Sequence, residues 1–311
     1  MVVPVYNESA GLADFNSRLV KELDSATNGS YEIIYCEDGS TDNTAELIHG
    51  FAKHNRKIRL ISFSRNFGKE IATTAGIHEA DAEAVMTIDA DGQHPVELIP
   101  EFIKRWRAGG KVVIGLRSSN SGQGLVKKTG SKLFYKVFNR LTKIKLVEGS
   151  TDFRLIDRSV QQEFRRMTER SRITRGLIDW LGYRREFIEF DAGPRLAGKA
   201  GYSFKKLFKL AIDSTISMSL SPLYISAYIG AVVLPLSLLI GLVMVINALA
   251  GDPLNLNATG SAYIVVLTLF LVGVLLVSQG IIGLYLSHIH TETQNRPLYV
   301  VDKEKSAGLN E

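Results

Sequence analysis

The stretch that decides the fold is Val85-Met86-Thr87-Ile88-Asp89-Ala90-Asp91-Gly92-Gln93-His94-Pro95. Its first four residues form an apolar run typical of a buried strand, and Pro95 limits how far a strand can extend. Side chains at positions i and i+2 of a strand point to one face, so Asp89 and Asp91 converge if the chain stays extended. If the chain turns at Gly92, the two carboxylates can lie on either side of a ligand instead.

The polar end of this stretch has the chemistry of a cation site. Asp89 and Asp91 offer carboxylate oxygens and Gln93 an amide oxygen, which are ligands that suit Mg²⁺ or Mn²⁺. These ions keep several waters and bridge to substrate phosphates. An Asp-x-Asp pair alone is a weak signal, and the alternative is a solvated acidic turn.

Apolar runs alternate with helical patterns through the first 117 residues. We expect strands at residues 1–3, 33–36, 58–63, 85–88 and 112–115, and helices at 9–26, 44–53, 69–80 and 97–107. Such alternation predicts an α/β domain with a mainly parallel sheet and right-handed crossovers. Ligands bind beyond the carboxyl ends of parallel strands, which is where Glu8, Asp38, Arg65 and Asp89 fall.

The C-terminal third differs sharply in composition. Between residues 214 and 291 only Asp252 is acidic, none is Lys or Arg, and the histidines are His288 and His290. Two apolar segments, near residues 223–249 and 262–286, each exceed the roughly 20 residues that cross a bilayer. Lysines precede the first and basic residues follow the second, so the positive-inside rule places both termini in the cytoplasm. The alternative is a buried hairpin of a soluble protein.

Other features narrow the function classes. The net charge of +5 and pI near 9.1 favour anionic partners, and the basic residues beside the apolar segments favour lipid over nucleic acid. A basic amphipathic helix expected at residues 127–146 either lies on a membrane or packs on the sheet. The lone Cys36 excludes an internal disulfide, and no N-terminal signal peptide is visible. The sequence has no Walker motif and no Gly-x-Gly-x-x-Gly after the first strand.

Six motifs together resemble one enzyme family. Pro4-Val5-Tyr6-Asn7-Glu8, Glu37-Asp38-Gly39-Ser40-Thr41-Asp42 and Asp89-Ala90-Asp91 resemble the nucleotide-sugar motifs of family-2 inverting glycosyltransferases, which have the GT-A fold. Three more resemble the polyprenyl-phosphate sugar transferases, including dolichol-phosphate mannose synthase and the bactoprenol glucosyltransferases: Ser64-Arg65-Asn66-Phe67-Gly68-Lys69-Glu70, Thr151-Asp152-Phe153-Arg154-Leu155-Ile156-Asp157-Arg158 and Arg195-Leu196-Ala197-Gly198. The chain departs from the pattern in its short first strand and at Glu37, Gly92 and His94.

The resemblance implies roles for individual residues. The nucleoside would be held by Pro4, Tyr6, Glu8 and Asp38, and the diphosphate with Mg²⁺ or Mn²⁺ by Asp89, Asp91 and Gln93. The acceptor phosphate would face Arg117, Ser131, Arg195 and Lys199. Asp152 would lie beside the acceptor as the candidate base. Because a phosphate monoester has a second pKa of about 6 and is largely anionic at neutral pH, Asp152 can instead orient the acceptor. A further alternative is a structural Asp that caps a turn.

The resemblance also implies an organisation and a reaction. The expected segments are a cytosolic GT-A domain at residues 1–200, an interfacial amphipathic segment at 201–221, a two-helix transmembrane hairpin at 222–290 and a cytosolic tail at 291–311. The expected reaction is inverting transfer of one hexose, glucose from UDP-glucose, to undecaprenyl or another polyprenyl phosphate at the cytoplasmic face of the cell membrane. The alternatives are a GDP-mannose or amino-sugar donor, a processive polysaccharide synthase, and a membrane-tethered nucleotide-sugar-binding protein. Small residues in the spans would allow homo-oligomers.

Overall fold

The structure is a computed structural model that describes residues 1–118, 147, 149–170, 172–191, 193 and 260–308, with scattered positions between 223 and 251. The described residues form two compact units. The first contains the residues up to 193 together with those from Asn295 onward, and the second contains those between 223 and Gln294. The segment after the long helix therefore belongs to the first unit.

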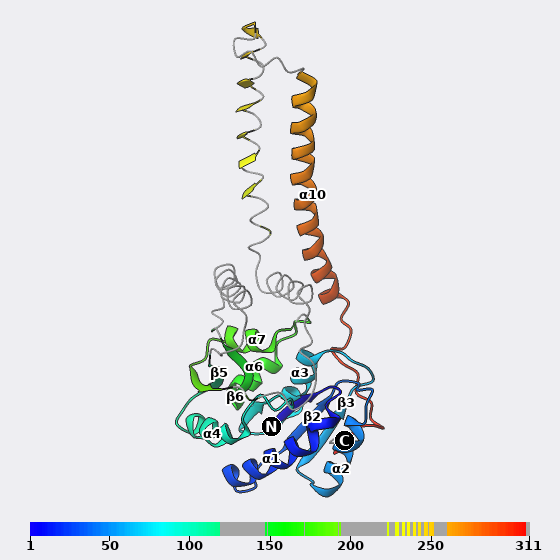
Figure 1. Ribbon diagram of the computed structural model, residues 1–311, viewed down its shortest axis with the longest axis vertical. Coiled ribbons are helices and arrows are strands. Elements are labelled where there is room, and N and C mark those ends of the chain that lie inside the picture. The colour runs from blue at the N-terminus through cyan, green and yellow to red at the C-terminus, as the bar shows by residue number, and fades with distance from the viewer. Residues whose placement is uncertain are drawn as a thin grey trace. The chain divides into compact units, whose positions relative to one another are not determined.

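The first unit is built on a seven-stranded sheet with the order β3-β2-β1-β4-β6-β5-β7 (Figure 1). Every neighbouring pair is parallel except those of β6, which is antiparallel to both β4 and β5. This confirms the mainly parallel α/β sheet, whereas the last two strands were not expected from the sequence. The bounds are β1 Val2–Val5, β2 Ile33–Glu37, β3 Ile58–Ser62, β4 Ala84–Thr87, β5 Val112–Arg117, β6 Ser150–Asp157 and β7 Arg185–Phe190.

Helices cover both faces of this sheet. One face packs against α1 (Ser9–Thr27), α2 (Thr44–His54), η1 (Val96–Leu98) and α4 (Ile99–Arg107). The other packs against α3 (Lys69–Glu79), α6 (Arg158–Arg165) and α7 (Thr174–Trp180). Successive strand residues serve opposite faces, as Val2 and Val3 do, because strand side chains alternate. The four helices expected between residues 9 and 107 are all present, and the last begins with a 3₁₀ turn.

The first strand runs through Pro4, where the sequence suggested a break. The carbonyls of Met1 and Val5 accept the N–H groups of Ile34 and Asp38 in and beyond β2. The backbone N–H and C=O positions of residues 2 and 4 therefore point toward β4. The pairing with β4 is limited to Val2. Pro4 lacks an N–H group, but no ladder bond is required on that side, so the strand tolerates it.

The second unit contains the helix α10 (Gly260–Thr293), which confirms the helix expected at residues 262–286. Its segment Phe270–Thr293 has a mean hydropathy of 2.0 and is long and apolar enough to cross a membrane. Among the described residues no other helix meets that test. The first expected span, at 223–249, is described only at scattered positions, and the segments at 127–146 and 201–221 lie outside the described residues.

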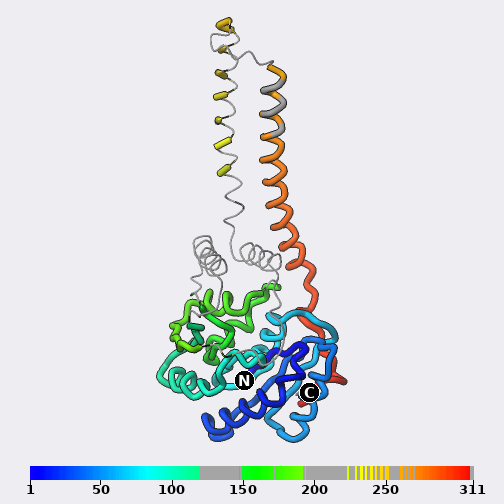
Figure 2. The backbone as a smooth tube through the Cα atoms, in the orientation of Figure 1, coloured from blue at the N-terminus to red at the C-terminus, as the bar shows by residue number. Residues whose placement is uncertain are grey.

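The segment after α10 pairs with the sheet. Val301 bridges Phe63 and Ala307 bridges Leu60, both in antiparallel fashion. Figure 2 shows this red segment beside the blue part of the chain. The expected C-terminal tail is thus an added edge of the sheet beyond β3.

Candidate functional site

Hydrogen bonds join the loops that follow β1 and β2. The Asn7 N–H donates to Ser40 Oγ at 3.0 Å, and the Glu8 N–H donates to Thr44 Oγ1 at 3.0 Å. Tyr6 directly precedes Asn7 and Glu8 in sequence and is 45% exposed, so its ring is open to a ligand. Tyr6 and Glu8, two of the expected nucleoside residues, therefore lie beyond β1 next to the second motif, whereas Pro4 lies within β1.

Asp38 connects the end of β2 to the loop before α3. It is 3% exposed, and its carboxylate oxygens accept the N–H groups of Phe67 at 2.6 Å and Gly68 at 2.9 Å. Burial raises the pKa of Asp38 although these two bonds oppose the rise. Gly39 has φ 69°, and a Cβ there would lie 2.4 Å from the carbonyl carbon of Arg65. The backbone on both sides thus fixes this carboxylate, which has lone pairs left for a base.

Glu37, the residue before Asp38, makes contacts within the fold. This side chain is 2% exposed, accepts the Ser62 hydroxyl at 2.7 Å and accepts the Ser40 N–H. Glu37 therefore ties β2 to β3 and leaves Asp38 as the carboxylate at the edge.

The acidic loop after β4 turns rather than staying extended. Gly92 has φ 77°, and the Gln93 N–H donates to Asp91 Oδ1 at 3.0 Å. Arg117 ends β5 and donates from Nη1 to Gln93 Oε1 at 3.3 Å. The structure thus brings an arginine that was expected to face the acceptor next to a residue that was expected to face the metal.

His94 supports the same loop from within the core. It is 7% exposed, and its ring stacks on Phe153 with centroids 5.2 Å apart. Its Nδ1 accepts the Asp89 N–H at 3.3 Å, which leaves the proton of a neutral ring on Nε2. Burial lowers the pKa of His94. The histidine is therefore fixed by packing on Phe153 and holds the backbone of Asp89 by a hydrogen bond.

Lys69 brings two of the expected functional carboxylates together. Its Nζ lies 2.7 Å from Asp89 Oδ1 and 2.9 Å from Asp152 Oδ2. Lys69 is the first residue of α3, and Asp152 lies near the start of β6. Because β6 is antiparallel, its first residues lie at the edge where β4 ends. Asp152 is thus in a strand, not in the turn that one alternative gave it.

Neighbouring charges determine the ionisation of Lys69 and Asp152. Burial alone would lower the pKa of Lys69, yet the carboxylates of Asp152 and Asp89 raise it above its usual range. Burial alone would raise the pKa of Asp152, yet Lys69, Arg175 and Arg154 hold it well below its usual range. At neutral pH Lys69 is therefore an ammonium and Asp152 a carboxylate, and both side chains are partly exposed.

A buried ionic group lies behind Asp152. Arg154 is 1% exposed and donates from Nη2 to the Thr151 carbonyl at 3.1 Å. Its Nη1 lies 3.6 Å from Asp179 Oδ1, and Arg185 Nη1 lies 3.6 Å from the other oxygen. These contacts connect the strand that carries Asp152 to α7 and β7.

The loop chemistry fits a divalent ion. The described residues contain no group of three or more His, Cys, Asp or Glu that could hold one. Asp89, Asp91 and Gln93 instead offer two carboxylates and one amide oxygen from one turn. Mg²⁺ and Mn²⁺ suit such a short ligand set when water and substrate phosphates complete the coordination. These residues therefore fit a divalent ion whose remaining ligands are water and the oxygens of a diphosphate.

Sequence reasoning and structure overlap only partly at this site. Ser131, Arg195 and Lys199 lie outside the described residues. Lys69 received no role from the sequence, although its place at a helix start after β3 was a usable signal. The contacts of Arg154 with Asp179 depend on pairing distant in sequence and had no local signal.

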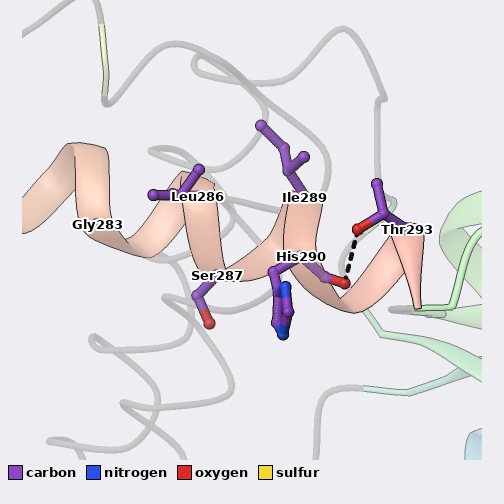
Figure 3. Close-up of a pocket in the computed structure, with 6 residues that line it drawn as sticks. All are labelled: Gly283, Leu286, Ser287, Ile289, His290 and Thr293. Atoms are coloured by element: carbon purple, nitrogen blue, oxygen red, sulfur yellow. Dashed lines mark hydrogen bonds between the residues drawn. The ribbon is translucent and has the colours of Figure 1, made fainter.

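The surface hollow on α10 is a different feature. It is lined by Gly283, Leu286, Ser287, Ile289, His290 and Thr293, and the Thr293 hydroxyl donates to the His290 carbonyl (Figure 3). None of these six described residues is acidic, and none belongs to the motifs above. The chemistry is therefore assigned to the edge of the sheet.

Comparison with known proteins gives a consistent result. The model of the glycosyl transferase family 2 matches residues 1–165. An uncharacterised glycosyltransferase of Synechocystis is 40% identical over 301 residues, which are 97% of this chain and 93% of the relative. The bactoprenol glucosyl transferase of Shigella phage SfV is 36% identical, and a prophage bactoprenol glucosyl transferase homologue of Escherichia coli is 34% identical; each covers 98% of both chains. The chain, with its GT-A-like sheet, therefore belongs to glycosyl transferase family 2.

Proposed function

We propose that this protein transfers one glucose residue from UDP-glucose to undecaprenyl phosphate or a related polyprenyl phosphate, with inversion, at the cytoplasmic face of the membrane. Similarity to bactoprenol glucosyl transferases along nearly the whole chain supports the acceptor and the sugar. The structural observation that carries the proposal is the Lys69 contact. It unites a donor-side carboxylate, Asp89, with the acceptor-side carboxylate Asp152.

The reaction exchanges one C–O bond for another. The bond between the anomeric carbon and the β-phosphate oxygen breaks, and its electron pair leaves with UDP. An oxygen of the lipid phosphate forms the new bond on the opposite face of the sugar. Because UDP-glucose is an α-glycoside, the product of inversion is a β-linked glucosyl phosphate lipid.

Each part of the site has a task in this exchange. Asp38, Tyr6, Glu8 and Pro4 bind the nucleoside. A divalent ion held by Asp89, Asp91 and Gln93 would offset the charge that develops on the leaving diphosphate. On the acceptor side, Arg117, with Ser131, Arg195 and Lys199, attracts the lipid phosphate, since Arg binds phosphate oxygens in a bidentate manner.

Asp152 acts as an orienting group in this proposal. Its pKa lies below the usual range, so it is a weak base, and the lipid phosphate needs little deprotonation near neutral pH. Lys69 Nζ lies 2.9 Å from the Asp152 carboxylate. Its positive charge reduces the repulsion between this carboxylate and the phosphate groups of the donor and the acceptor. Holding the acceptor in line is a large part of such catalysis.

The membrane helix would keep the enzyme where the acceptor lies. A polyprenyl phosphate keeps its chain in the bilayer and its head group at the surface. An anchor such as the apolar part of α10, together with the first expected span at residues 223–249, keeps the enzyme at that surface. This proposal includes two spans with both termini in the cytoplasm.

A transfer assay tests the proposal. The full chain in nanodiscs receives undecaprenyl phosphate, Mg²⁺ or Mn²⁺, and radiolabelled UDP-glucose, with other UDP- and GDP-sugars in parallel. We expect one labelled, organic-extractable lipid that forms from UDP-glucose only with a divalent ion, with β configuration by NMR. A product ladder would support a processive synthase, and binding without transfer would support a binding protein.

A matched pair of variants links the assay to the loop. Asp91→Ala removes an expected metal ligand and should abolish most of the transfer. Asp81→Ala removes an exposed carboxylate that pairs with Arg158 at the other end of β4, and should leave transfer unchanged. Full turnover by Asp91→Ala with added metal would count against the proposed metal site.

A further inference from the structure

The segment after α10 binds the edge strand β3 along its length. Leu60 and Ala307 exchange two backbone hydrogen bonds of 2.9 Å. Nearer the end of the strand, the Asp302 N–H donates to the Ser62 carbonyl at 2.8 Å, and the Ser64 N–H donates to the Val300 carbonyl at 3.0 Å. The last of these bonds lies beyond β3, on the loop that leads to α3.

Aromatic side chains continue this contact toward the site. The Tyr299 ring stacks on Phe63 with centroids 5.0 Å apart and planes at 19°. Phe63 is 2% exposed and meets Phe67 edge to face at 5.7 Å. The guanidinium carbon of Arg65 lies 4.0 Å from the centre of the Phe67 ring. Stacked and edge-to-face pairs at these separations are favourable and restrict ring orientation.

This row of rings ends at the group that holds Asp38. The N–H groups of Phe67 and Gly68 are the donors to the Asp38 carboxylate. A shift of Phe67 therefore moves both donors, and the backbone of Arg65 against Gly39 leaves little room for adjustment. No residue of the segment after α10 needs to touch the donor to influence this carboxylate.

We propose that Tyr299 is a positioning residue of the donor site: through Phe63 and Phe67 it fixes the loop at residues 64–68 and hence the Asp38 carboxylate that binds the nucleoside. This inference rests on the proposed function for the identity of the donor. It makes the segment after the membrane helix part of the donor site of the same enzyme, although that segment lies more than two hundred residues from Asp38 in sequence.

The alternative is that the segment only covers the edge of the sheet, since an uncovered edge strand leaves backbone groups unpaired. The two ends of the segment separate these explanations. The Ala307 end contacts β3 away from the loop, whereas the Tyr299 end contacts Phe63 at the start of the loop. A covering role predicts equal effects at both ends, and a positioning role predicts an effect on the donor only at the Tyr299 end.

Three variants of the full chain test the proposal in nanodiscs with Mn²⁺. Tyr299→Ala removes the ring, Tyr299→Phe keeps the stack, and Ala307→Pro removes the N–H that donates to Leu60. The readouts are the Kd for UDP by calorimetry, the KM for UDP-glucose, the KM for undecaprenyl phosphate, kcat and Tm. For Tyr299→Ala we expect the Kd and the donor KM to rise about tenfold, which equals about 1.4 kcal/mol. The lipid KM and kcat should stay within about twofold, since only donor binding is affected.

The controls define the other outcomes. Tyr299→Phe should restore the wild-type Kd, and Ala307→Pro should lower Tm without changing the Kd. Unchanged UDP binding by Tyr299→Ala would overturn the inference, and so would an equal loss in Tyr299→Ala and Ala307→Pro. If the wild-type chain binds no UDP, the proposed function fails, which is distinct from wild-type binding that the variants do not alter.

Discussion

Asp38 and Asp152 lie at the same edge of the sheet, yet the protein holds them by opposite means. Asp38 is held by backbone N–H groups, and burial raises its pKa. Asp152 is held by the Lys69 side chain, and that charge with two arginines keeps its pKa low despite burial. Asp38, which we propose for the donor side, thus depends on loop conformation, and Asp152, which we propose for the acceptor side, depends on a charge. Substitutions on the two sides should therefore change different measured quantities.

The largest effect is expected on the acceptor side. Asp152→Asn removes the charge that we propose faces the acceptor, and kcat should fall at least about 100-fold, the lower range for a positioned group that handles a proton or charge. UDP binding by calorimetry should remain, since the nucleoside site is intact. A loss of UDP binding equal to the loss of kcat would show that the two carboxylates are not separate in function.

The next effect concerns the cation between the carboxylates. Lys69→Met leaves Asp89 and Asp152 facing one another without the ammonium, so kcat should fall about 10- to 100-fold, as expected for the loss of a charged hydrogen bond. Lys69→Arg should recover part of the rate because the charge remains. Lys104→Met removes a cation that is 79% exposed and pairs with Glu101 on α4, and it serves as the comparison for a general loss of positive charge. Equal rates for Lys69→Met and the wild type would remove Lys69 from the proposed site.

A smaller effect is expected from the backbone on the donor side. Gly39→Ala places a side chain at φ 69° and against the backbone of Arg65, which should cost about 1–3 kcal/mol of unfolding free energy. The Asp38 carboxylate would shift with it, so the KM for UDP-glucose should rise while the lipid KM stays constant. Thermal unfolding and donor kinetics on the same preparation check both parts. A rise in the lipid KM instead would contradict the division between the two sides.

The smallest effect on the proposed reaction is expected from His78, which lies outside both sides of the site and changes only how stability depends on pH. His78 lies near the far end of α3 from Lys69, packs on Phe164, and has its pKa lowered to about 4 by burial and by Arg172 and Arg165. The unfolded chain binds a proton near pH 6.5. Stability from this neutral ring is therefore full above pH 6.5 and falls as the pH drops toward 4.

His78→Gln should flatten that dependence. Between pH 7 and pH 4.5 the variant should lose less unfolding free energy than the wild type by about 1–3 kcal/mol. Denaturant unfolding of both proteins in the same detergent at several pH values measures the difference. Parallel curves would show that other titrating groups govern the acid sensitivity of the fold.

The donor side was the part of the molecule that local sequence patterns could predict. Leu12, Phe15, Leu19 and Leu23 recur at helical spacing, and α1 buries all four. The acidic ends of β2 and β4 follow apolar runs, so their common edge follows from the parallel topology. The polar loop after β4 follows the expected strand, and its turn at Gly92 was one of two open alternatives; its role in metal binding stays a prediction.

The acceptor side could not be predicted in the same way. The strand β6 contains Asp152 and the fully buried Arg154, so its sequence lacks the apolar pattern of a strand. Its antiparallel insertion between β4 and β5 is a tertiary property. The Lys69 contact joins three elements at residues 69, 89 and 152, and no spacing along the chain indicates it. Ser131, Arg195 and Lys199 remain predictions.

The return of the chain to β3 after α10 has a practical consequence for work with soluble fragments. Stopping the chain before the helical unit would also remove residues 295–308 and leave Leu60, Ser62 and Ser64 without the partners that the structure gives them. A bare strand of this kind pairs readily with other chains and promotes aggregation. A soluble fragment should therefore replace the helices with a flexible linker and keep the residues that follow them.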